Sequence, residues 1–275
     1  MPVMNVATPD EFRKLCRKEL HTTHTSGVLP GYIQANLLIL PKKEARDFAD
    51  LCYRNPVPCP LLAVTNGDPK ILNDDKIIKP GTFDIRTDFP MYNIYEKGTI
   101  IARKPNCIEE WAADYVGFLI GCSYSFERAL SLAGLPPKNL TATKCVTMFK
   151  TSKLMDPAGI FTNCCYVVSM RPYKLIDVPK VREITRNFQR THGEPIDWGF
   201  EGAKRLGISD LSCPDYGDAI EIADDEIPVF WACGVTPQLA VETVGHLING
   251  TVIGHSPGSM LLCDLKDDDM CSTKF

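Results

Sequence analysis

Along the first part of the chain, hydrophobic residues at helical spacing alternate with short continuous apolar runs that are typical of buried strands. A helix is expected to begin at Thr8, where a capping residue, a proline and a glutamate stand in capping-box spacing, and apolar positions at helical spacing continue to Leu20. A continuous apolar run over residues 36–40 ends before a proline and predicts a buried strand. A second helix is predicted over residues 42–54, and a second buried strand over residues 60–64.

The same two patterns continue through the rest of the chain. Residues 108 to about 120 are apolar on most faces and begin with a capping pair, Asn106 and Glu109, so we expect a central buried helix there. The other predicted elements are helices at 126–132, 181–190 and from Thr236, and strands at 145–150, 164–170, 227–231, 252–253 and 260–265.

The order of these elements predicts an α/β fold. Strands and helices alternate in the first half, whereas the middle contributes two strands followed by a helix. We therefore expect a three-layer mixed α/β body formed by residues 1–140 and 231–275. A smaller two-layer α+β unit is expected over residues 141–230.

Composition narrows the class of protein. The 275 residues are 44% hydrophobic and 23% charged, which is ordinary for a globular protein with a sizeable core. A net charge of -4 argues against a nucleic-acid partner, and no apolar run approaches the ~20 residues of a membrane helix. No secretory signal is evident, so we expect a soluble cytoplasmic protein. Basic residues within 13–18 keep the mitochondrial matrix as an alternative, and a homo-oligomer is left open.

The turn over residues 121–127 is the first candidate for chemistry. Ser123 and Ser125 can cap the helix that follows, and the free N–H groups of a helix start favour a carboxylate or an oxyanion. Glu127 stands in the first turn, near any anion bound there. The alternative is a plain helix cap with a solvated glutamate.

A second turn, over residues 230–238, has a similar character. Thr236 opens a helix directly after a strand and a glycine. Cys233 is either a nucleophile, which would need a lowered pKa, or a packing residue. The twelve cysteines include no C-x-x-C pair, and most of them sit in apolar runs, as Cys263 does, which favours packing.

Charged loop residues supply further candidates. Arg86, close to Asp88, and Arg171 suit bidentate recognition of a carboxylate, although each arginine could equally be a structural surface charge. His192 and His255 stand in glycine- and proline-containing loops. Each is either an acid or base near neutral pH or a helix-end cap.

Several known motifs are excluded. The segment 254–258 matches the G-x-S-x-G nucleophile elbow, but no histidine follows Ser256 in the chain, and Pro257 has no N–H for an oxyanion hole. Neither the dinucleotide fingerprint nor the P-loop sequence occurs. A serine α/β-hydrolase and a nucleotide-binding protein are therefore not expected.

Several of these turns belong to longer blocks that together resemble the D-glutamate cyclase family, whose bacterial members are often labelled hydro-lyases. The blocks are PGYIQANL (30–37), RNP (54–56), PCPLL (58–62), RTDFP (86–90), FLIGCSYSFE (118–127), VVSMRP (167–172), PDYGD (214–218), PVFWACGVTPQ (228–238) and HSPG (255–258). The resemblance runs from about residue 27 to residue 265. Departures from the family pattern lie in the middle of the chain, at Asp197, at 200–201, at 145–147 and at 163–165.

The resemblance implies cyclisation of D-glutamate to 5-oxo-D-proline with loss of water, without a cofactor or a metal. Such a site needs a clamp for the α-carboxylate, a base for the ammonium group, donors for the oxyanion and an acid for the leaving oxygen. The catalytic candidates are Glu127 or Asp218 as the base, His192 or His255 as the acid, and Ser123 and Ser125 at the oxyanion. The substrate-binding candidates are Arg86, Asp88, Arg171, Cys233 and Thr236.

The expected partner is thus a small anionic amino acid. Three alternatives stay open at this point. The chain could be a hydro-lyase or amide-bond enzyme on another small carboxylic acid, or a metabolite-binding protein without catalysis. It could also be a cysteine hydrolase acting through Cys233.

Overall fold

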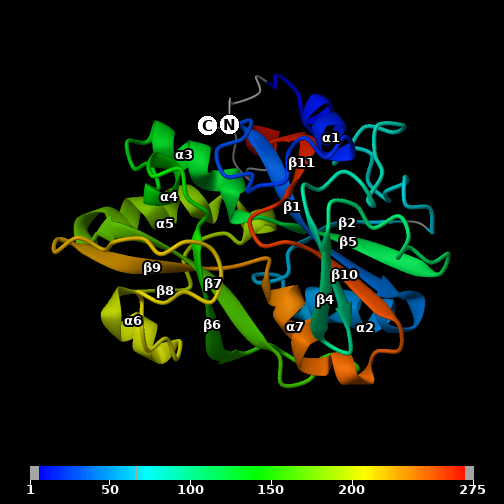
Figure 1. Cartoon of the computed structure of the whole chain (residues 1–275). Coiled ribbons are helices and arrows are strands. Elements are labelled where there is room, and N and C mark those ends of the chain that lie inside the picture. The colour runs from blue at the N-terminus through cyan, green and yellow to red at the C-terminus, as the bar shows by residue number, and fades with distance from the viewer. Residues whose placement is uncertain (1–5, 66, 270–275) are drawn as a thin grey trace.

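The computed structural model describes residues 6–65 and 67–269, and it contains two antiparallel β-sheets (Figure 1). The larger sheet has the order β2 (Leu61–Val64), β5 (Tyr115–Gly121), β1 (Tyr32–Pro41), β10 (Thr251–His255), β3 (Tyr92–Glu96) and β4 (Thr99–Lys104), and β11 (Leu261–Lys266) also pairs with β1. The smaller sheet has the order β6 (Thr147–Leu154), β7 (Cys165–Lys174), β9 (Glu226–Ala232) and β8 (Asp197–Trp198).

Strand β1 is the centre of the larger sheet. One of its edges pairs with β5 from Ala35 to Pro41. Its other edge changes partner, because β11 pairs with it up to Ala35 and β10 pairs with it at Leu38 and Ile39. Nearly every residue of β1 is buried, as the continuous apolar run predicts for a strand that is covered on both faces.

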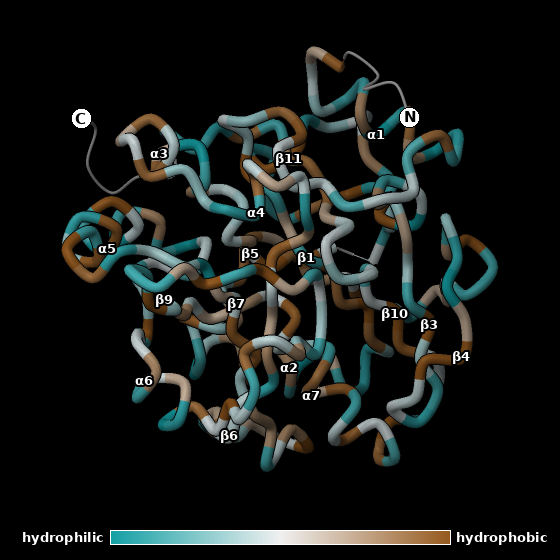
Figure 2. Tube along the Cα trace, turned by 60° about the vertical axis from the view of Figure 1, so that its left-hand side comes forward, coloured by the Kyte–Doolittle hydropathy of each residue, from teal (hydrophilic) through white to brown (hydrophobic). Residues whose placement is uncertain are grey.

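The two faces of the larger sheet are covered differently. Helices α2 (Lys42–Arg54) and α7 (Thr236–Val244) pack on one face, where Phe48 and Val241 join the same core cluster as Leu38. The opposite face is covered by an irregular segment at 72–89 rather than by helices. Helix α1 (Pro9–Arg17) packs on β11. Hydrophobic stretches run through the centre of the trace around β1 and β5, and others lie at its edge, as on β4 (Figure 2).

Helices cover both faces of the smaller sheet. On one face lie α3 (Glu127–Leu132) and α5 (Val178–Arg186), and on the other lies α6 (Gly199–Arg205). Side chains of β7 alternate accordingly, so Ser169 and Arg171 face α3 whereas Met170 faces α6. The short helices are α4 (Lys138–Thr141), η1 (Ser123–Phe126), η2 (Leu175–Asp177), η3 (Gln189–Thr191), η4 (Gly245–Leu247) and η5 (Asp267–Asp269).

The predicted helix from 108 to about 120 is wrong. Its second half is strand β5, which pairs with both β1 and β2, and residues 108–110 form a turn. A strand buried on both faces is apolar throughout, so its sequence has the all-round hydrophobicity of a buried helix. The Asn106 side chain accepts a hydrogen bond from Ile108 N over 3.4 Å, within this turn.

The hairpin of β3 and β4 was not predicted from the sequence. Its two-residue turn is Lys97-Gly98, with φ of 48° and 82°, the left-handed pair that a tight hairpin requires. The feature of the sequence that could have predicted this hairpin is a glycine between two runs of residues with high β propensity. Strand β4 is largely exposed, and this weakened the alternation that would have marked it.

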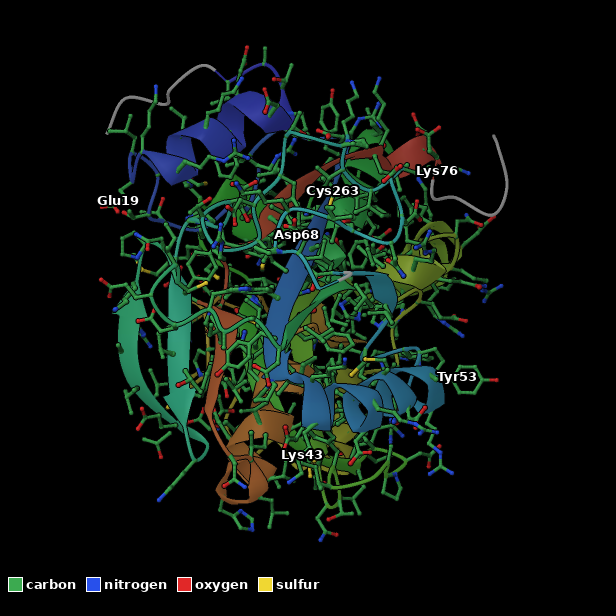
Figure 3. All side chains as sticks on the ribbon, turned by 90° about the vertical axis from the view of Figure 1, so that its right-hand side faces the viewer. Glu19, Lys43, Tyr53, Asp68, Lys76 and Cys263 are labelled. Carbon is green, nitrogen blue, oxygen red and sulfur yellow. The ribbon has the colours of Figure 1, made fainter. Side chains whose placement is uncertain are left out.

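The mixed α/β class is confirmed, and most other predicted elements are present with shifted ends. The predicted helix at 181–190 is α5 followed by η3, and the helix predicted from 126 is preceded by η1. Burial of most cysteines agrees with a packing role; Cys263 lies inside the molecule, whereas Tyr53 of α2 points into solvent (Figure 3). The division of the chain into a body and a middle unit over residues 141–230 stays a prediction.

Among the helices of residues 6–65 and 67–269, none combines the length and the hydropathy that a membrane span needs.

Candidate active site

The end of β5 is the point where β1, η1 and η3 meet. Two hydrogen bonds tie the turn to the backbone of β1: Cys122 N donates to the carbonyl oxygen of Gln34 over 3.0 Å, and Gln34 N donates to Ser125 Oγ over 3.0 Å. A Cβ atom on Gly121 would lie 2.0 Å from the carbonyl oxygen of Arg190, so a glycine is needed for this approach of the two backbones. The turn that carries Glu127 and the loop that carries His192 are therefore held side by side.

A buried ion pair stands at this meeting point. Arg171 of β7 donates to Glu127 Oε1 from Nη2 over 2.6 Å and from Nε over 3.1 Å. The guanidinium also donates to Ser123 Oγ and Ser169 Oγ, each over 3.1 Å. Asn139 Nδ2 donates to the same Oε1 over 3.0 Å. Sequence reasoning had singled out Arg171, Glu127 and Ser123, and the structure brings these three together.

The two carboxylate oxygens of Glu127 differ sharply. Oε1 accepts the hydrogen bonds from Arg171 and Asn139, whereas Oε2 is buried and accepts none from the described residues. Burial raises the pKa of Glu127, against the lowering effect of Arg171 and Asn139. A buried acceptor without a donor is costly, so this oxygen is suited to a ligand or to proton transfer.

Aromatic rings hold the guanidinium from the other side. Its carbon lies 5.1 Å from the ring centre of Phe126 and 5.4 Å from that of Trp231. These distances allow cation–π attraction, which compensates part of the cost of burying the charge. Arg171 is therefore fixed from all sides and cannot swing out to meet a ligand at the surface.

His192 lies beside this pair in an unusual backbone conformation. Its φ is 86°, in the left-handed region, and its ring is buried. Nδ1 lies 2.8 Å from the carbonyl oxygen of Val57, and because a carbonyl only accepts, the neutral ring keeps its proton on Nδ1. Burial lowers the pKa of His192 to about 4. Nε2 is thus a buried lone pair, and no described residue donates to it.

His255 has the opposite tautomer and a different setting. Its Nδ1 accepts from Leu37 N over 3.1 Å and lies 2.9 Å from Gln238 Nε2, so the ring proton resides on Nε2. Leu37 falls between the β11 and β10 pairings of β1, and the imidazole therefore caps an N–H that neither strand bonds. Burial lowers the pKa of His255 to about 4 as well. These contacts give His255 a structural task in the sheet.

Three other candidates accept hydrogen bonds from backbone N–H groups, and a fourth, Cys233, packs against a side chain. Ser125 Oγ accepts from Gln34 N as described above, and Thr236 Oγ1 accepts from Val167 N over 2.9 Å, which ties α7 to β7. Asp218 is exposed, and its Oδ2 accepts from the backbone N of Cys145 over 2.8 Å. The Cys233 thiol contacts the sulfur of Met148 at 3.5 Å, and burial raises its pKa to about 12, which makes it a poor nucleophile near neutral pH.

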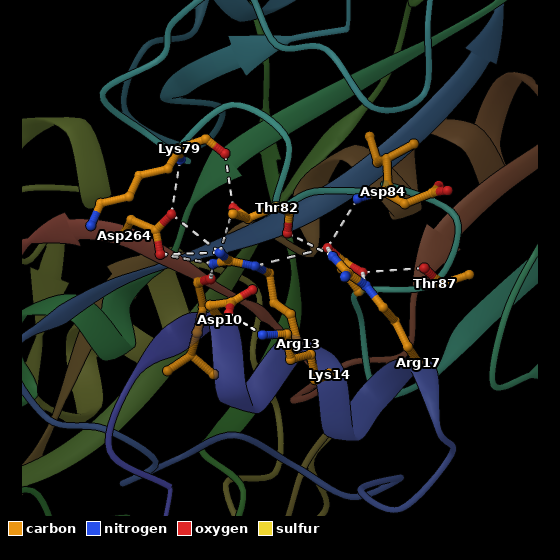
Figure 4. Close-up of polar contacts among 12 residues, drawn as sticks. Asp10, Arg13, Lys14, Arg17, Lys79, Thr82, Asp84, Thr87 and Asp264 are labelled. Atoms are coloured by element: carbon orange, nitrogen blue, oxygen red, sulfur yellow. Dashed lines mark hydrogen bonds and ion pairs between the residues drawn. The ribbon is translucent and has the colours of Figure 1, made fainter.

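Arg86 and Asp88 belong to a different cluster, near α1. Figure 4 shows Arg17 and Asp84, which are their partners in this cluster. Arg86 is paired with Asp84 through two hydrogen bonds of 2.8 and 2.7 Å. Asp88 is fully buried and pairs with Arg17 at 2.6 Å and Arg13 at 3.8 Å. The structure therefore does not bring Arg86 or Asp88 into contact with the Arg171–Glu127 pair.

A cavity of about 260 Å³ lies between the loop at 27–32 and helix α3. Its lining includes the buried residues Gln34, Tyr124 and Glu127 together with several apolar side chains. The cavity thus lies against Glu127, the residue that carries the unpartnered oxygen.

Sequence reasoning missed two residues of this site. Ser169 stands two positions before Arg171 on β7, so strand alternation places both on one face, and this signal was present in the sequence. Asn139 lies in the short helix α4, and nothing in its local sequence indicated a contact with Glu127. Across residues 6–65 and 67–269, no group of three or more His, Cys, Asp or Glu side chains is arranged to hold a metal ion.

Comparison with known proteins gives a consistent result. A family model described as D-glutamate cyclase matches residues 116–264. A Schizosaccharomyces pombe protein named "putative hydro-lyase" is 44% identical over 261 residues, which cover 94% of this chain and 85% of that protein. A Rubrobacter xylanophilus protein of the same name is 43% identical over 257 residues, covering 94% and 95% of the two chains. Another, from Verminephrobacter eiseniae, is 42% identical over 270 residues, covering 98% and 94%.

Proposed function

Because the chain belongs to the D-glutamate cyclase family, we propose that it is a hydro-lyase that converts D-glutamate into 5-oxo-D-proline and water. In this reaction the α-amine nitrogen bonds to the side-chain carboxyl carbon, and one oxygen of that carboxyl group leaves as water. The ring closure is intramolecular and redox-neutral. The site must therefore orient one molecule and move protons within it.

The observation that carries the proposal is the buried Glu127 with its unpartnered Oε2. The α-ammonium group must lose a proton before its nitrogen can attack, and Oε2 is the basic atom available for it. The raised pKa of Glu127 suits both halves of the cycle, because the carboxyl group can then return a proton to the leaving oxygen.

Arg171 and Ser123 supply stabilisation of negative charge. Ser123 Oγ accepts a hydrogen bond from Arg171, so its own hydroxyl proton is available for an oxyanion. Arg171 is held by Glu127 and two aromatic rings, so its positive charge is pre-organised before substrate binds. Its positive field also favours the substrate carboxylates.

His192 takes a role that differs from the sequence expectation of an acid. With its proton held on Nδ1 by the Val57 carbonyl, its free Nε2 accepts rather than donates. We therefore assign His192 to orienting the ammonium group beside Glu127. The opposite tautomer and the sheet contacts of His255 favour a supporting role for that residue.

Proton NMR of the purified protein with D-glutamate, and with L-glutamate in parallel, tests the proposal. We expect 5-oxoproline to appear from the D isomer and not from the L isomer. Product from neither isomer would overturn the proposed reaction while leaving the family membership in place. Cell fractionation would test the proposed cytoplasmic location against the mitochondrial matrix.

A further inference from the structure

Asn36, on the central strand β1, has a buried side chain to which the proposed mechanism gives no role. Its Nδ2 donates to the carbonyl oxygens of Gly121 over 2.8 Å and Ile120 over 3.2 Å. Both partners are carbonyl oxygens, so only the NH₂ end of the amide can face them, and the orientation of the side chain is fixed. The opposite atom, Oδ1, is buried and accepts no hydrogen bond from the described part of the chain.

The turn between β9 and α7 closes tightly over this amide. A Cβ atom on Gly234 would lie 1.9 Å from Asn36 Nδ2 and 2.8 Å from Oδ1. Any residue other than glycine would therefore push the amide from its place. Asn36 thus lies between the two turns, at 121–127 and 230–238, that the sequence marks as suited to anion binding.

A second buried asparagine shows that the fold is able to satisfy such a group. Asn55 also donates through Nδ2 to two backbone carbonyls, those of Leu51 over 2.9 Å and Asp156 over 2.8 Å. Its Oδ1, however, accepts from Asp156 N over 2.9 Å. The open acceptor of Asn36 is therefore not a requirement of a buried asparagine in this fold, and it is of the kind that a ligand completes.

The neighbours of Asn36 indicate the chemistry of that ligand. The Gly121 carbonyl that Asn36 binds also faces the His192 ring, where it opposes the lowering of the pKa by burial. The same turn continues to Glu127. Three buried acceptors without described donors, Asn36 Oδ1, His192 Nε2 and Glu127 Oε2, thus lie on segments that join at the end of β5. A primary ammonium group carries three N–H donors.

We propose that Asn36 is a substrate-binding residue whose Oδ1 accepts a hydrogen bond from the primary ammonium group of an amino acid. This rests on the proposed function, and it adds a third acceptor beside Glu127 and His192. It also explains the glycine at position 234, which leaves room for the amide.

Three variants test the proposal: Asn36→Ala, Gly234→Ala and the double variant. Gly234→Ala alone should lower Tm, because its new methyl group meets the amide, and removing the amide in the double variant should restore part of that loss. Binding and kcat/KM for D-glutamate should stay reduced by roughly 10- to 100-fold in both variants that lack the asparagine. Asn55→Ala is the matched control, and should lower Tm without a comparable loss of binding.

The ligand pair D-glutamate and glutarate separates this proposal from the proposed function. Glutarate has both carboxylates and no ammonium group, so Asn36→Ala should weaken calorimetric binding of D-glutamate and leave that of glutarate nearly unchanged. Equal weakening of both ligands, or recovery of activity in the double variant, would show that Asn36 only packs. If the wild-type protein binds D-glutamate through Asn36 without turnover, the proposed reaction fails while the ammonium site stands. If the wild type binds neither ligand, the ammonium site is overturned too.

Discussion

Glu127 and Asp88 are both buried carboxylates paired with arginine, yet their oxygens are used in opposite ways. Asp88 Oδ1 accepts from Arg17 and Thr87, and its Oδ2 accepts from Arg17 and from the backbone N of Asp84. In Glu127 the donors Arg171 and Asn139 converge on Oε1, and no described residue donates to Oε2. Burial raises the pKa of both groups. Burial and pairing with arginine are therefore common to both groups, and the open acceptor atom is what sets Glu127 apart from Asp88.

The surroundings of Asp88 and Glu127 agree with this difference between their carboxylate oxygens. The Asp88 cluster joins α1 to the larger sheet, since Arg13 also bonds Asp264 and the carbonyl oxygen of Leu262 (Figure 4). The arginine contacts there link α1 to the segment at 82–88 and to β11, so the cluster holds the first helix in place. The Glu127 cluster opens on a cavity and keeps atoms unpartnered.

The largest effect is expected when the open carboxylate is neutralised. Glu127→Gln keeps the shape of the side chain and its contact with Arg171, but it removes the base, so turnover should fall by at least about 1,000-fold. Tm should change little by comparison. Glu201→Gln, at an exposed glutamate paired with Lys204, is the matched control and should keep full activity. Full activity of the Glu127→Gln variant would remove this residue from the mechanism.

Removal of Asp88, whose two carboxylate oxygens both accept hydrogen bonds, should lower the stability of the protein rather than its activity. Asp88→Ala leaves Arg13 and Arg17 without their shared partner, and loss of one member of a buried pair costs about 3–5 kcal/mol. Urea unfolding measures this loss. At a temperature where the variant is folded, KM for D-glutamate should be unchanged, and a large rise in KM would return Asp88 to the substrate site.

Lowering the pH should destabilise the folded protein through its two buried histidines, His192 and His255. Burial lowers the pKa of His192 and of His255 to about 4, so between about pH 4 and 6.5 the unfolded state binds more protons than the folded state. Stability is therefore lost as the pH falls through this window, by on the order of 3 kcal/mol for each histidine. The raised pKa of Glu127 acts in the opposite direction above about pH 4.5 and offsets part of the loss.

Urea unfolding at pH 7 and pH 4.5 checks this expectation. The difference in unfolding free energy between the two pH values should shrink in His255→Gln, which has no imidazole to protonate there. His255→Gln should also be less stable at pH 7, because Leu37 N loses its acceptor. An unchanged pH dependence would contradict the assignment of a depressed pKa to His255.

The smallest effect is expected at Arg86. Its guanidinium is partly exposed and already paired with Asp84, so Arg86→Gln should cost at most about 1 kcal/mol. KM for D-glutamate should stay within about twofold of the wild type, in contrast to the effect at a substrate clamp. Steady-state kinetics decides the point, and a tenfold rise in KM would support the sequence hypothesis that Arg86 binds a carboxylate.

Local sequence predicted those elements whose cause is local. The capping box at Thr8 and the helix ahead of Pro56 follow from side-chain and proline geometry within a few residues. The continuous apolar run of β1 predicted a buried strand correctly, whereas the same pattern at β5 was interpreted as a helix. Whether an apolar run becomes a strand or a helix depends on which neighbours cover it, and those neighbours are distant in sequence.

The candidate site was predictable only in part for the same reason. Arg171 and Glu127 were selected as chemical types, but their contact spans 44 positions and needs β7 to lie against α3. Arg86 and Asp88 looked equally suitable in sequence, and only the positions of Asp84 and Arg17 show that they are already occupied. An atom such as Asn36 Oδ1 is recognised as unpartnered because no described donor lies within hydrogen-bond distance. Distances of this kind cannot be predicted from the sequence.

The change of partner along β1 has a consequence for synthesis of the protein. Leu38 pairs with Gly254, a residue that the ribosome adds 216 positions later. At 5–20 residues per second the growing chain carries one unpaired edge of this buried strand for roughly 10–40 s. An open apolar edge is a site for wrong pairing with other chains. Nascent chains should therefore depend on chaperones until β10 and β11 have been made, and truncation before residue 251 should yield aggregates rather than a smaller folded protein.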